Sequence, residues 1–267
     1  MVEGSTNRNP VVADYSEWRA RDYFQTYYSE VVLPDEQAVL AYQIEVLRAA
    51  RARFGRGLEY GCGPTMHRAI AAAKYAFRID MADWLADNLA EARDWLCADE
   101  SAPEWKRFTR YVLACEGHPR PDNKKVIRRE ALTRKVVRGL YVSDARLRQP
   151  LGPAREAFYD LIITGFCIDA ISSDPRVFRR CLRNVSSMLQ PGGTFIIHAL
   201  HQCKAYKCGD RMFPGSNLTI DTLRDCMLEN GFAPSTIDVQ VIPCPDNHPY
   251  GYSGILTASA RKSVKRR

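Results

Sequence analysis

Short apolar runs alternate with longer amphipathic stretches along most of the chain. Each run has the length of a strand, and the stretch that follows carries apolar residues at helical spacing. This alternation is typical of β-α-β units that form a mostly parallel sheet between helices. We therefore predict an α/β protein whose single sheet has seven strands, at residues 57–60, 77–81, 108–115, 161–165, 194–200, 236–242 and 255–260.

The first part of the chain has a different pattern, with large side chains at helical spacing and no strand-like run. These side chains are Tyr15, Trp18, Tyr23, Tyr27 and Val31. Pro34 and Asp35 then mark the start of a second amphipathic helix, expected at 36–53. The pattern predicts an N-terminal helical lid at residues 1–54.

The α/β core is expected at residues 55–260, within one domain that spans residues 1–267. A stretch rich in Lys and Arg at 119–153 keeps partial helical spacing and is expected to be an exposed helix. Residues 261–267 contain five positive charges, and we expect a solvated basic tail there.

Composition narrows the class of protein. Hydrophobic residues make up 46% and charged residues 26% of the 267 positions, which is typical of a globular chain and not of a disordered one. No apolar run approaches the ~20 residues of a membrane-spanning helix, and the first residues do not resemble a secretory signal. Nine scattered cysteines suit a reducing compartment, so we expect a cytoplasmic protein without disulfides. Cysteine and histidine spacing predicts no metal site.

A glycine turn gives the sharpest chemical signal. The apolar end of the first strand leads into Gly61-Cys62-Gly63-Pro64-Thr65 and then into an alanine-rich helix. Glycine is required where the backbone turns sharply and where a ligand must approach without a Cβ in the way. A dinucleotide fingerprint would continue with a third glycine, but Met66 stands at that position. The shorter turn favours S-adenosylmethionine (SAM), whose tail is an amino acid and not a pyrophosphate.

An acid about 20 residues beyond such a turn accepts hydrogen bonds from ribose hydroxyls. Asp80 lies 19 residues after Gly61 and Asp83 lies 22 residues after it, so spacing alone leaves both open.

Several segments together resemble the nicotinamide, phenylethanolamine and thioether (indolethylamine) N-methyltransferases, a family of class I SAM-dependent enzymes. The segment Tyr23-Phe24-Gln25-Thr26-Tyr27-Tyr28 is similar to their N-terminal tyrosine lid, residues 60–65 to their cofactor loop, and residues 83–89 to their ribose segment. The likeness extends over roughly residues 15–261. It implies a Rossmann-like, mostly parallel seven-stranded class I methyltransferase sheet.

The resemblance also implies which residues bind SAM and its product S-adenosylhomocysteine. It assigns the ribose to Asp83 and not to Asp80, places Asn88 beside the cofactor, and directs Asp144 and the backbone of Ala145 to the adenine. The full implied set is Tyr23, Tyr28, Gly61, Cys62, Gly63, Thr65, Asp83, Asn88, Asp144, Ala145 and Gly165.

For the methyl acceptor, the resemblance implies a wall made of Tyr23, Phe166, Asp169, His198, Tyr206 and Tyr250. Asp169 would stabilise positive charge on the acceptor, and Tyr23 would hold both ligands in place. His198 stands where many relatives carry an acid, which argues against nicotinamide as the acceptor. His198 is expected to act as a base if the acceptor is a protonated amine.

Each of these three residues also has a structural interpretation. Tyr23 would belong to the buried stripe of a helix, Asp169 would cap the helix that follows it, and His198 would be a hydrogen-bonded histidine of the core. Capping is equally open to Asp83, and it is compatible with ribose binding.

We predict an N-methyltransferase for a small-molecule nitrogen: an amine, an amino-acid side chain such as a guanidino group, or an N-heteroaromatic ring. A role in specialised metabolism is a further hypothesis. We expect a monomer that binds no nucleic acid and no membrane. One alternative is an O-methyltransferase that uses His198, His201 or His248 as its base. Another is a nucleic-acid-binding protein or RNA methyltransferase, suggested by seven basic residues between Lys124 and Arg138.

Overall fold

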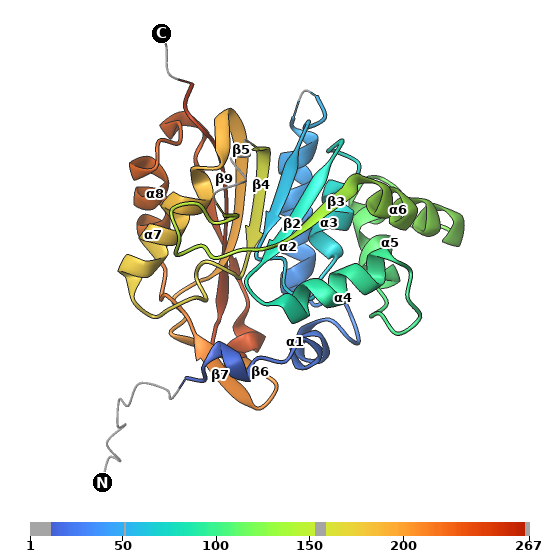
Figure 1. Ribbon diagram of the computed structural model, residues 1–267, viewed down its shortest axis with the longest axis horizontal. Coiled ribbons are helices and arrows are strands. Elements are labelled where there is room, and N and C mark those ends of the chain that lie inside the picture. The colour runs from blue at the N-terminus through green and yellow to red at the C-terminus, as the bar shows by residue number, and fades with distance from the viewer. Residues whose placement is uncertain (1–11, 51, 153–158, 265–267) are drawn as a thin grey trace.

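Seven strands form one twisted sheet in the computed structural model, which describes residues 12–50, 52–152 and 159–264 (Figure 1). The strand order is β3-β2-β1-β4-β5-β9-β8. The first five strands in this order pair in parallel, and β9 runs antiparallel to both β5 and β8. The strands are β1 (Gly57–Tyr60), β2 (Ile79–Asp83), β3 (Val137–Val142), β4 (Tyr159–Gly165), β5 (Leu189–Leu200), β8 (Asp238–Pro243) and β9 (Gly254–Arg261). The predicted class I methyltransferase sheet is confirmed.

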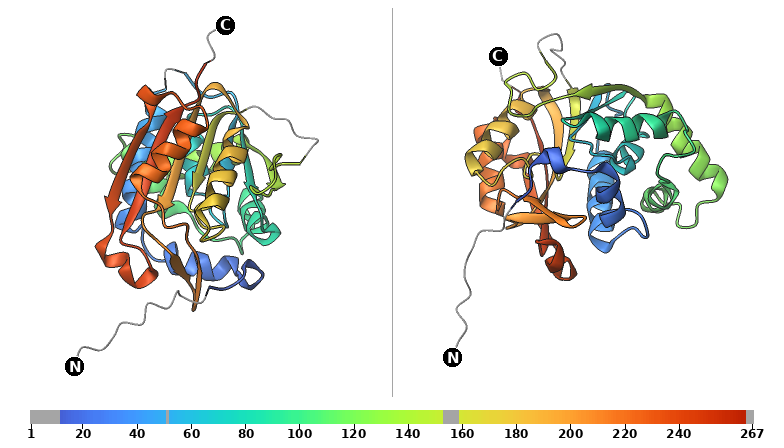
Figure 2. Two further views of the ribbon diagram at one scale, coloured as in Figure 1. Left: turned by 90° about the vertical axis from the view of Figure 1, so that its left-hand side faces the viewer. Right: turned by 60° about the horizontal axis from the view of Figure 1, so that its bottom comes forward.

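Helices cover both faces of the sheet (Figures 1 and 2). One apolar cluster joins the sheet to α2 (Pro34–Arg48), α3 (His67–Ala72), α4 (Ala86–Leu96) and α5 (Lys106–Cys115). The other joins it to α7 (Pro175–Ser186) and α8 (Ile220–Glu229). Residues of β4 alternate between the two, with Leu161 and Ile163 in the first cluster and Ile162 in the second. Burial on both faces explains why β4 is a continuous apolar run.

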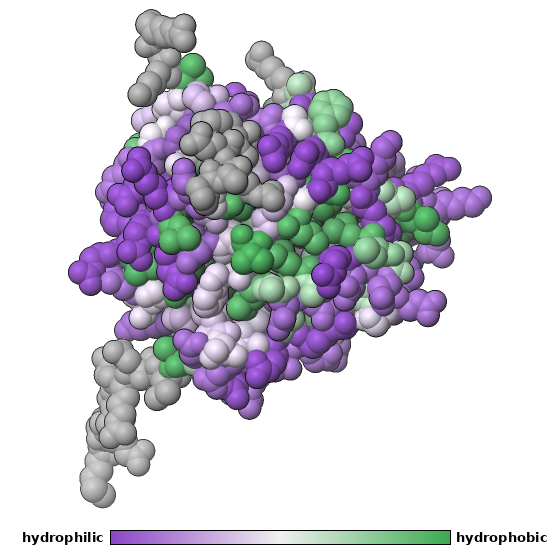
Figure 3. All heavy atoms as spheres, in the orientation of Figure 1, coloured by the Kyte–Doolittle hydropathy of each residue, from purple (hydrophilic) through white to green (hydrophobic). Residues whose placement is uncertain are grey.

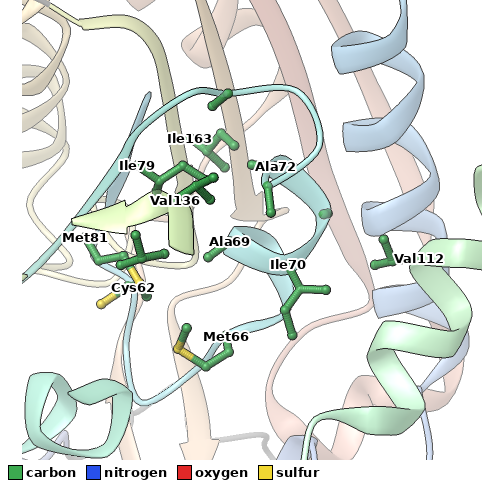
Figure 4. Packing of buried hydrophobic residues seen from close by; sticks show 14 of the residues in the cluster. Cys62, Met66, Ala69, Ile70, Ala72, Ile79, Met81, Val112, Val136 and Ile163 are labelled. Atoms are coloured by element: carbon green, nitrogen blue, oxygen red, sulfur yellow. The ribbon is translucent and has the colours of Figure 1, made fainter. Parts of the chain in front are cut away.

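Figure 4 shows how the first cluster packs. Ala69 of α3 lies on the side of Ile79 of β2 and Ile163 of β4, whereas Ile70 lies on the side of Val112 of α5, and all five are buried. This packing fixes α3 directly behind the glycine turn that precedes it. The turn is therefore held between a strand and a helix, neither of which is free to shift.

The first two described helical elements and a small hairpin lie together at one end of the molecule (Figure 2). A 3₁₀ turn, η1 (Tyr15–Glu17), and helix α1 (Ala20–Tyr27) contact the hairpin of β6 (Ala205–Cys208) and β7 (Arg211–Pro214). The Tyr27 hydroxyl donates to the carbonyl of Lys207, and Gly209 N donates to Thr26 Oγ1 at 3.0 Å. Two further 3₁₀ turns, η2 (Pro234–Thr236) and η3 (Pro245–Tyr250), flank β8. No pattern in the sequence predicts this hairpin.

The predicted third strand is wrong: residues 108–115 lie in α5. Phe108, Thr109, Val112 and Leu113 are its buried residues, and this spacing forms one face of a helix. The third strand is β3, which directly follows α6 (Asn123–Val136) inside the stretch expected to be helix alone. The predicted second strand is two residues early, since Phe77 is exposed and β2 ends at Asp83.

The limits of the lid also differ from the prediction. Helix α2 packs on β8, β9, α3 and α5, so it belongs to the core, and only η1 and α1 lie over the end of the sheet. Arg261 ends β9, and Lys262 and Ser263 are hydrogen-bonded to residues 193 and 231. The described part of the predicted tail is thus attached to the core; its last three residues, like residues 1–11, lie outside the described ranges.

The strand order reverses direction between β1 and β4, because the chain adds β2 and β3 on one side of β1 and then crosses to the other side. In parallel α/β sheets, ligands bind outside the carboxyl ends of the strands at such a switch point. Among the described residues, no helix is long and apolar enough to cross a membrane.

Candidate active site

Two adjoining cavities lie at the carboxyl ends of the strands. The larger, of about 210 Å³, is lined by residues that follow β1, β2, β3 and β4. The smaller, of about 30 Å³, lies among α1, the start of α2 and the segment after η3. Tyr23, Phe166, Ala170 and Tyr206 line both cavities and form their shared wall. On the face of the molecule shown in Figure 3, apolar residues gather across the middle and hydrophilic residues surround them.

Asp83 is the central polar group of the larger cavity. Its Oδ2 accepts from Gly63 N at 2.8 Å, and its Oδ1 accepts from Leu85 N at 2.9 Å and from Asn88 Nδ2 at 3.0 Å. Burial raises the pKa of Asp83, and the hydrogen bonds from Leu85, Gly63 and Asn88 oppose that rise. Each carboxylate oxygen has two lone pairs, so Oδ2 has room for a ribose hydroxyl.

Asp80 lies elsewhere. Its carboxylate is fully buried and accepts from Arg56 Nη2 at 2.7 Å, from Arg78 Nε at 3.0 Å and from the Tyr159 hydroxyl at 3.1 Å. Side chains three residues apart on a strand point to opposite faces of the sheet. In addition, only Asp83 stands at the carboxyl end of β2, so the two carboxylates lie apart. The structure thus places Asp83, and not Asp80, in the cavity wall.

The glycines of the turn are required by space as well as by conformation. A Cβ on Gly61 would lie 2.0 Å from Cys167 Sγ, and both Gly61 and Gly63 have positive φ. Tyr23 covers the turn, with its Cε1 3.9 Å from the position of a Gly63 Cβ. Cys62 and Thr65 also line the cavity, and Thr65 Oγ1 donates to the carbonyl of Cys62 at 2.7 Å. A ligand can therefore approach the backbone of this turn closely.

The end of the cavity near β3 contains Asp144, Ala145 and Trp84. Asp144 makes a two-pronged ion pair with Arg146, and the Ala145 carbonyl accepts from Asn184 Nδ2 at 2.9 Å. Arg146 in turn lies over the Trp84 ring, 5.0 Å from its centroid. This end offers an aromatic face and polar edges, which suits an adenine ring.

The N-terminal segment is tied to the same site. Trp18 Nε1 donates to Asn88 Oδ1 at 3.0 Å, so Asn88 joins Trp18 to Asp83. The Trp18 ring lies 4.9 Å from the Tyr23 ring, centroid to centroid. Asn88 and Tyr23 thus both lie in the wall of the larger cavity and both contact Trp18.

The smaller cavity combines aromatic rings with two carboxylates. Its wall contains Tyr23, Tyr27, Tyr28, Leu33, Asp35, Glu36, Phe166, Ala170, Leu200, Tyr206 and Tyr252. Asp35 Oδ2 accepts from the Tyr252 hydroxyl at 3.2 Å, and Glu36 Oε1 accepts from the Tyr28 hydroxyl at 3.0 Å. Burial opposes ionisation of Glu36, but Arg68 and His67 outweigh it and lower its pKa to about 2. Glu36 is therefore ionised at neutral pH.

Asp169 lies directly behind the shared wall, between buried Ile168 and Ala170. Its Oδ2 accepts from Leu200 N at 2.9 Å, and its buried Oδ1 has no hydrogen-bond partner among the described residues. Burial raises its pKa to about 6 against the effect of the Leu200 hydrogen bond.

Like Asp169, two other predicted acceptor residues, His198 and Tyr250, lie outside both walls. His198 is fully buried in β5, where its Nδ1 is 2.8 Å from Thr257 Oγ1, and burial lowers its pKa to about 3. This is the core interpretation of His198, because the ring is hydrogen-bonded to its cross-strand neighbour Thr257 and lies 6.2 Å from the ring of Tyr42 in α2, centroid to centroid. Tyr250 packs on Tyr27, with ring centroids 5.6 Å apart, whereas Tyr252 provides the ring in the wall.

Sequence reasoning missed Arg68, Asp35, Glu36 and Tyr252. Arg68 was visible as a charge within the apolar, alanine-rich helix after the glycine turn, a position where a charge needs a partner. Asp35 and Glu36 follow Pro34 and resemble ordinary first-turn acids. No local sequence pattern predicts that Tyr252 lines a cavity, because its position relative to Asp35 depends on how the whole sheet is assembled. Among the described residues, no group of three or more His, Cys, Asp or Glu side chains could hold a metal ion.

The fold and the site define a class I SAM-dependent methyltransferase: a glycine turn after β1, an acid at the end of β2, and an aromatic lid over both. A model of the NNMT/PNMT/TEMT family matches residues 11–263. The chain belongs to this family, which confirms the resemblance found in the sequence, and SAM is its methyl donor.

Individual relatives are distant. Indolethylamine N-methyltransferase of Oryctolagus cuniculus is 27% identical over 220 residues, which cover 79% of this chain and 81% of that protein. Nicotinamide N-methyltransferase of Homo sapiens is 26% identical over 237 residues, which cover 87% of each chain. A solved structure of Burkholderia thailandensis 1,6-didemethyltoxoflavin-N1-methyltransferase, with its substrate and S-adenosylhomocysteine bound, aligns with a TM-score of 0.52 at 17% identity. That alignment covers 92% of this chain and 87% of the other and supports the fold.

Proposed function

We propose that this enzyme methylates a nitrogen of a small, basic amine. The observation that carries the proposal is the smaller cavity, whose wall combines six aromatic rings with Asp35 and ionised Glu36 and which adjoins the donor cavity at their shared wall. Aromatic faces and carboxylates are the groups that bind an ammonium ion.

Charge distinguishes nitrogen from oxygen as the acceptor. When bound, SAM supplies a methyl group on a positively charged sulfur. The nitrogen lone pair forms the new N–C bond while the S–C electrons return to sulfur, so the positive charge moves to nitrogen. Fixed carboxylates near that nitrogen stabilise the developing charge. An O-methyltransferase would instead need a base at the hydroxyl, and no histidine among the described residues lines either cavity.

A basic amine is protonated near neutral pH and must lose a proton before it can attack. Asp169, with its pKa raised to about 6 and an unpaired Oδ1, is better suited to accept that proton than Glu36, whose pKa is about 2. Tyr23 spans both cavities and positions the two reactants; such positioning lowers a barrier by up to about 7–11 kcal/mol.

The test is incubation of the enzyme with SAM and a panel of amines, guanidines, N-heteroaromatics, phenols and alcohols, followed by mass spectrometry. We expect the gain of one methyl group on a basic amine. Asp83→Ala serves as the inactive control, because it removes the acceptor for the ribose. Methylation confined to phenols or alcohols would contradict the proposal.

We further propose that the enzyme works as a cytoplasmic monomer without nucleic acid. All nine cysteines are free thiols, which suits a reducing compartment. The basic stretch of α6 is partly used within the protein, since buried Arg129 pairs with Glu116. Light scattering coupled to size-exclusion chromatography should give the mass of one chain.

A further inference from the structure

Arg68 is a buried cation in the wall of the donor cavity. Its side chain is only 2% exposed, and it extends from α3, the helix that follows the glycine turn. The guanidinium packs against Gly165 at the end of β4: a Cβ on Gly165 would lie 2.5 Å from Arg68 Nε and 2.8 Å from its Cζ. Gly165 is therefore needed for Arg68 to reach the cavity.

The guanidinium makes few of the hydrogen bonds it can make. Arginine has five N–H donors, and among the described residues Arg68 donates one hydrogen bond, from Nη2 to Glu36 Oε1 at 3.2 Å. This contact is long and has one prong, unlike the two-pronged pair that guanidinium and carboxylate form at full strength. Nε is buried without a partner. A buried donor left unpaired is destabilising, so a ligand that accepts from this guanidinium would be favoured.

Apart from Glu36, the titratable side chains next to Arg68 supply no negative charge to its guanidinium. Burial raises the pKa of Glu59 to about 8 despite the effect of Arg68, so Glu59 is neutral at pH 7. Burial and Arg68 together lower the pKa of His67 to about 4, so His67 is neutral as well. Ionised Glu36 balances Arg68, but its Oε1 is shared with the Tyr28 hydroxyl. A ligand carboxylate at the cavity face of Arg68 therefore meets an available donor.

We propose that Arg68 binds the carboxylate of the amino-acid tail of SAM. The order β3-β2-β1-β4 places Asp144, which follows β3, and Gly165, at the end of β4, three strands apart. Strands lie about 4.8 Å apart, so roughly 14 Å separates these ends, enough for an extended nucleoside with an amino-acid tail. With adenine near Asp144 and ribose at Asp83, the tail extends over β1 and β4 to Arg68.

The same geometry argues against the acceptor as the ligand of Arg68. Arg68 lines the larger cavity and is not part of the wall of the smaller one, whereas its partner Glu36 lines the smaller one. Within this ion pair, Arg68 thus faces the donor cavity and Glu36 faces the acceptor cavity. A tail carboxylate on Arg68 also offsets a positive charge that would otherwise oppose the cationic sulfur beside it.

The experiment compares two ligands that differ only in this carboxylate: S-adenosylhomocysteine and its decarboxylated analogue, which keeps the amine. Binding of each is measured by calorimetry. For the unaltered enzyme we expect the analogue to bind about 10–100-fold more weakly, as for loss of a buried charge-assisted pair. In Arg68→Met combined with Glu36→Gln, which removes both charges together, the two ligands should bind with nearly equal affinity.

Three comparisons make the result decisive. Arg68→Lys keeps the positive charge but loses the planar, two-pronged arrangement of N–H donors. It should give an intermediate preference for S-adenosylhomocysteine over the decarboxylated analogue. Asp83→Ala should weaken both ligands and leave their ratio unchanged. Thermal unfolding of each variant, with and without S-adenosylhomocysteine, verifies folding. A double variant that keeps the ratio of the unaltered enzyme, or loses both ligands equally, would overturn the assignment. The acceptor takes no part, so this result is independent of whether the acceptor is an amine.

Discussion

The two cavities of this enzyme share a wall, yet the chain builds them in different ways. The donor cavity is lined mainly by residues just after β1, β2, β3 and β4, so each follows a strand by a few positions. The acceptor cavity combines residues from α1, α2, β6 and the segment before β9. Two of these residues, Tyr23 and Tyr252, are 229 positions apart in the sequence. The first depends on the parallel sheet itself, and the second on elements added to it.

This difference separates donor binding from acceptor choice. Substitutions in the donor wall should change SAM affinity for any acceptor, whereas substitutions in the acceptor wall should leave SAM affinity nearly unchanged. Tyr23 and Tyr206 belong to both walls and couple the two sites.

The largest effect is expected for Asp83→Ala. The change removes the ribose acceptor and also releases Gly63 N and Leu85 N, which the carboxylate holds. We expect SAM affinity to fall about 100-fold or more, since hydrogen bonds to a charged group contribute about 1.5–3 kcal/mol each. Calorimetric titration measures this loss.

Asp80→Asn is the matched control for that prediction. Asp80 pairs with Arg56 and Arg78 away from the cavity, so its loss should lower the free energy of unfolding by about 2 kcal/mol and spare SAM affinity in the folded protein. If the two variants exchanged these phenotypes, the ribose would belong to Asp80.

Asp169→Asn should reduce kcat by about 100-fold, the lower end of the roughly 10²–10⁴-fold that a positioned proton acceptor typically contributes. Because the pKa of Asp169 is about 6, turnover of the unaltered enzyme should rise as pH increases through 6, where the carboxylate becomes ionised. The variant should lack this inflection. SAM affinity should change by less than about threefold, since Asp169 lines neither cavity directly.

His198→Gln distinguishes a base from a core residue. The pKa of His198 is about 3, so the ring is neutral throughout the working range and should contribute no inflection. We expect the variant to lose thermal stability through its contact with Thr257 and to keep the pH profile of the unaltered enzyme. A flattened profile would return His198 to the acid–base role first predicted for it.

A smaller effect is expected for Asp35→Asn, in which the side chain keeps its shape and loses its charge. The KM for the amine should rise about tenfold, because one of the two carboxylates that face the ammonium group loses its charge. SAM affinity should stay the same. Tyr250→Phe is the matched control, because Tyr250 lies outside the wall and should leave KM unchanged. Equal effects of the two substitutions would mean that the acceptor wall is misplaced.

The sequence was most informative where structure depends on neighbours along the chain. Gly61, Gly63 and Asp83 follow strands directly, and their chemistry is visible in their spacing. Asp80 and Asp83 could not be separated by counting, because the choice depends on where β2 ends. The prediction of a strand at residues 108–115 is wrong because a short apolar run fits a strand or a helix until its partners are known.

The acceptor wall was largely hidden for the same physical reason. Tyr252 reaches Asp35 across the sheet, a contact between residues 217 positions apart. His198 occupies the strand position where relatives suggested a substrate residue, but its side chain lies on the sheet face where it contacts Thr257 and Tyr42. Which face a strand residue presents depends on register, and register depends on the assembled sheet.

The most direct test of the central claim is a crystal structure with S-adenosylhomocysteine bound. We predict the ribose hydroxyls within hydrogen-bond distance of Asp83, the adenine beside Asp144, and the sulfur facing the wall shared by Tyr23 and Tyr206. Density for the ligand at any other place, with the crevice beyond β1 and β2 left vacant at saturating ligand, would contradict the account.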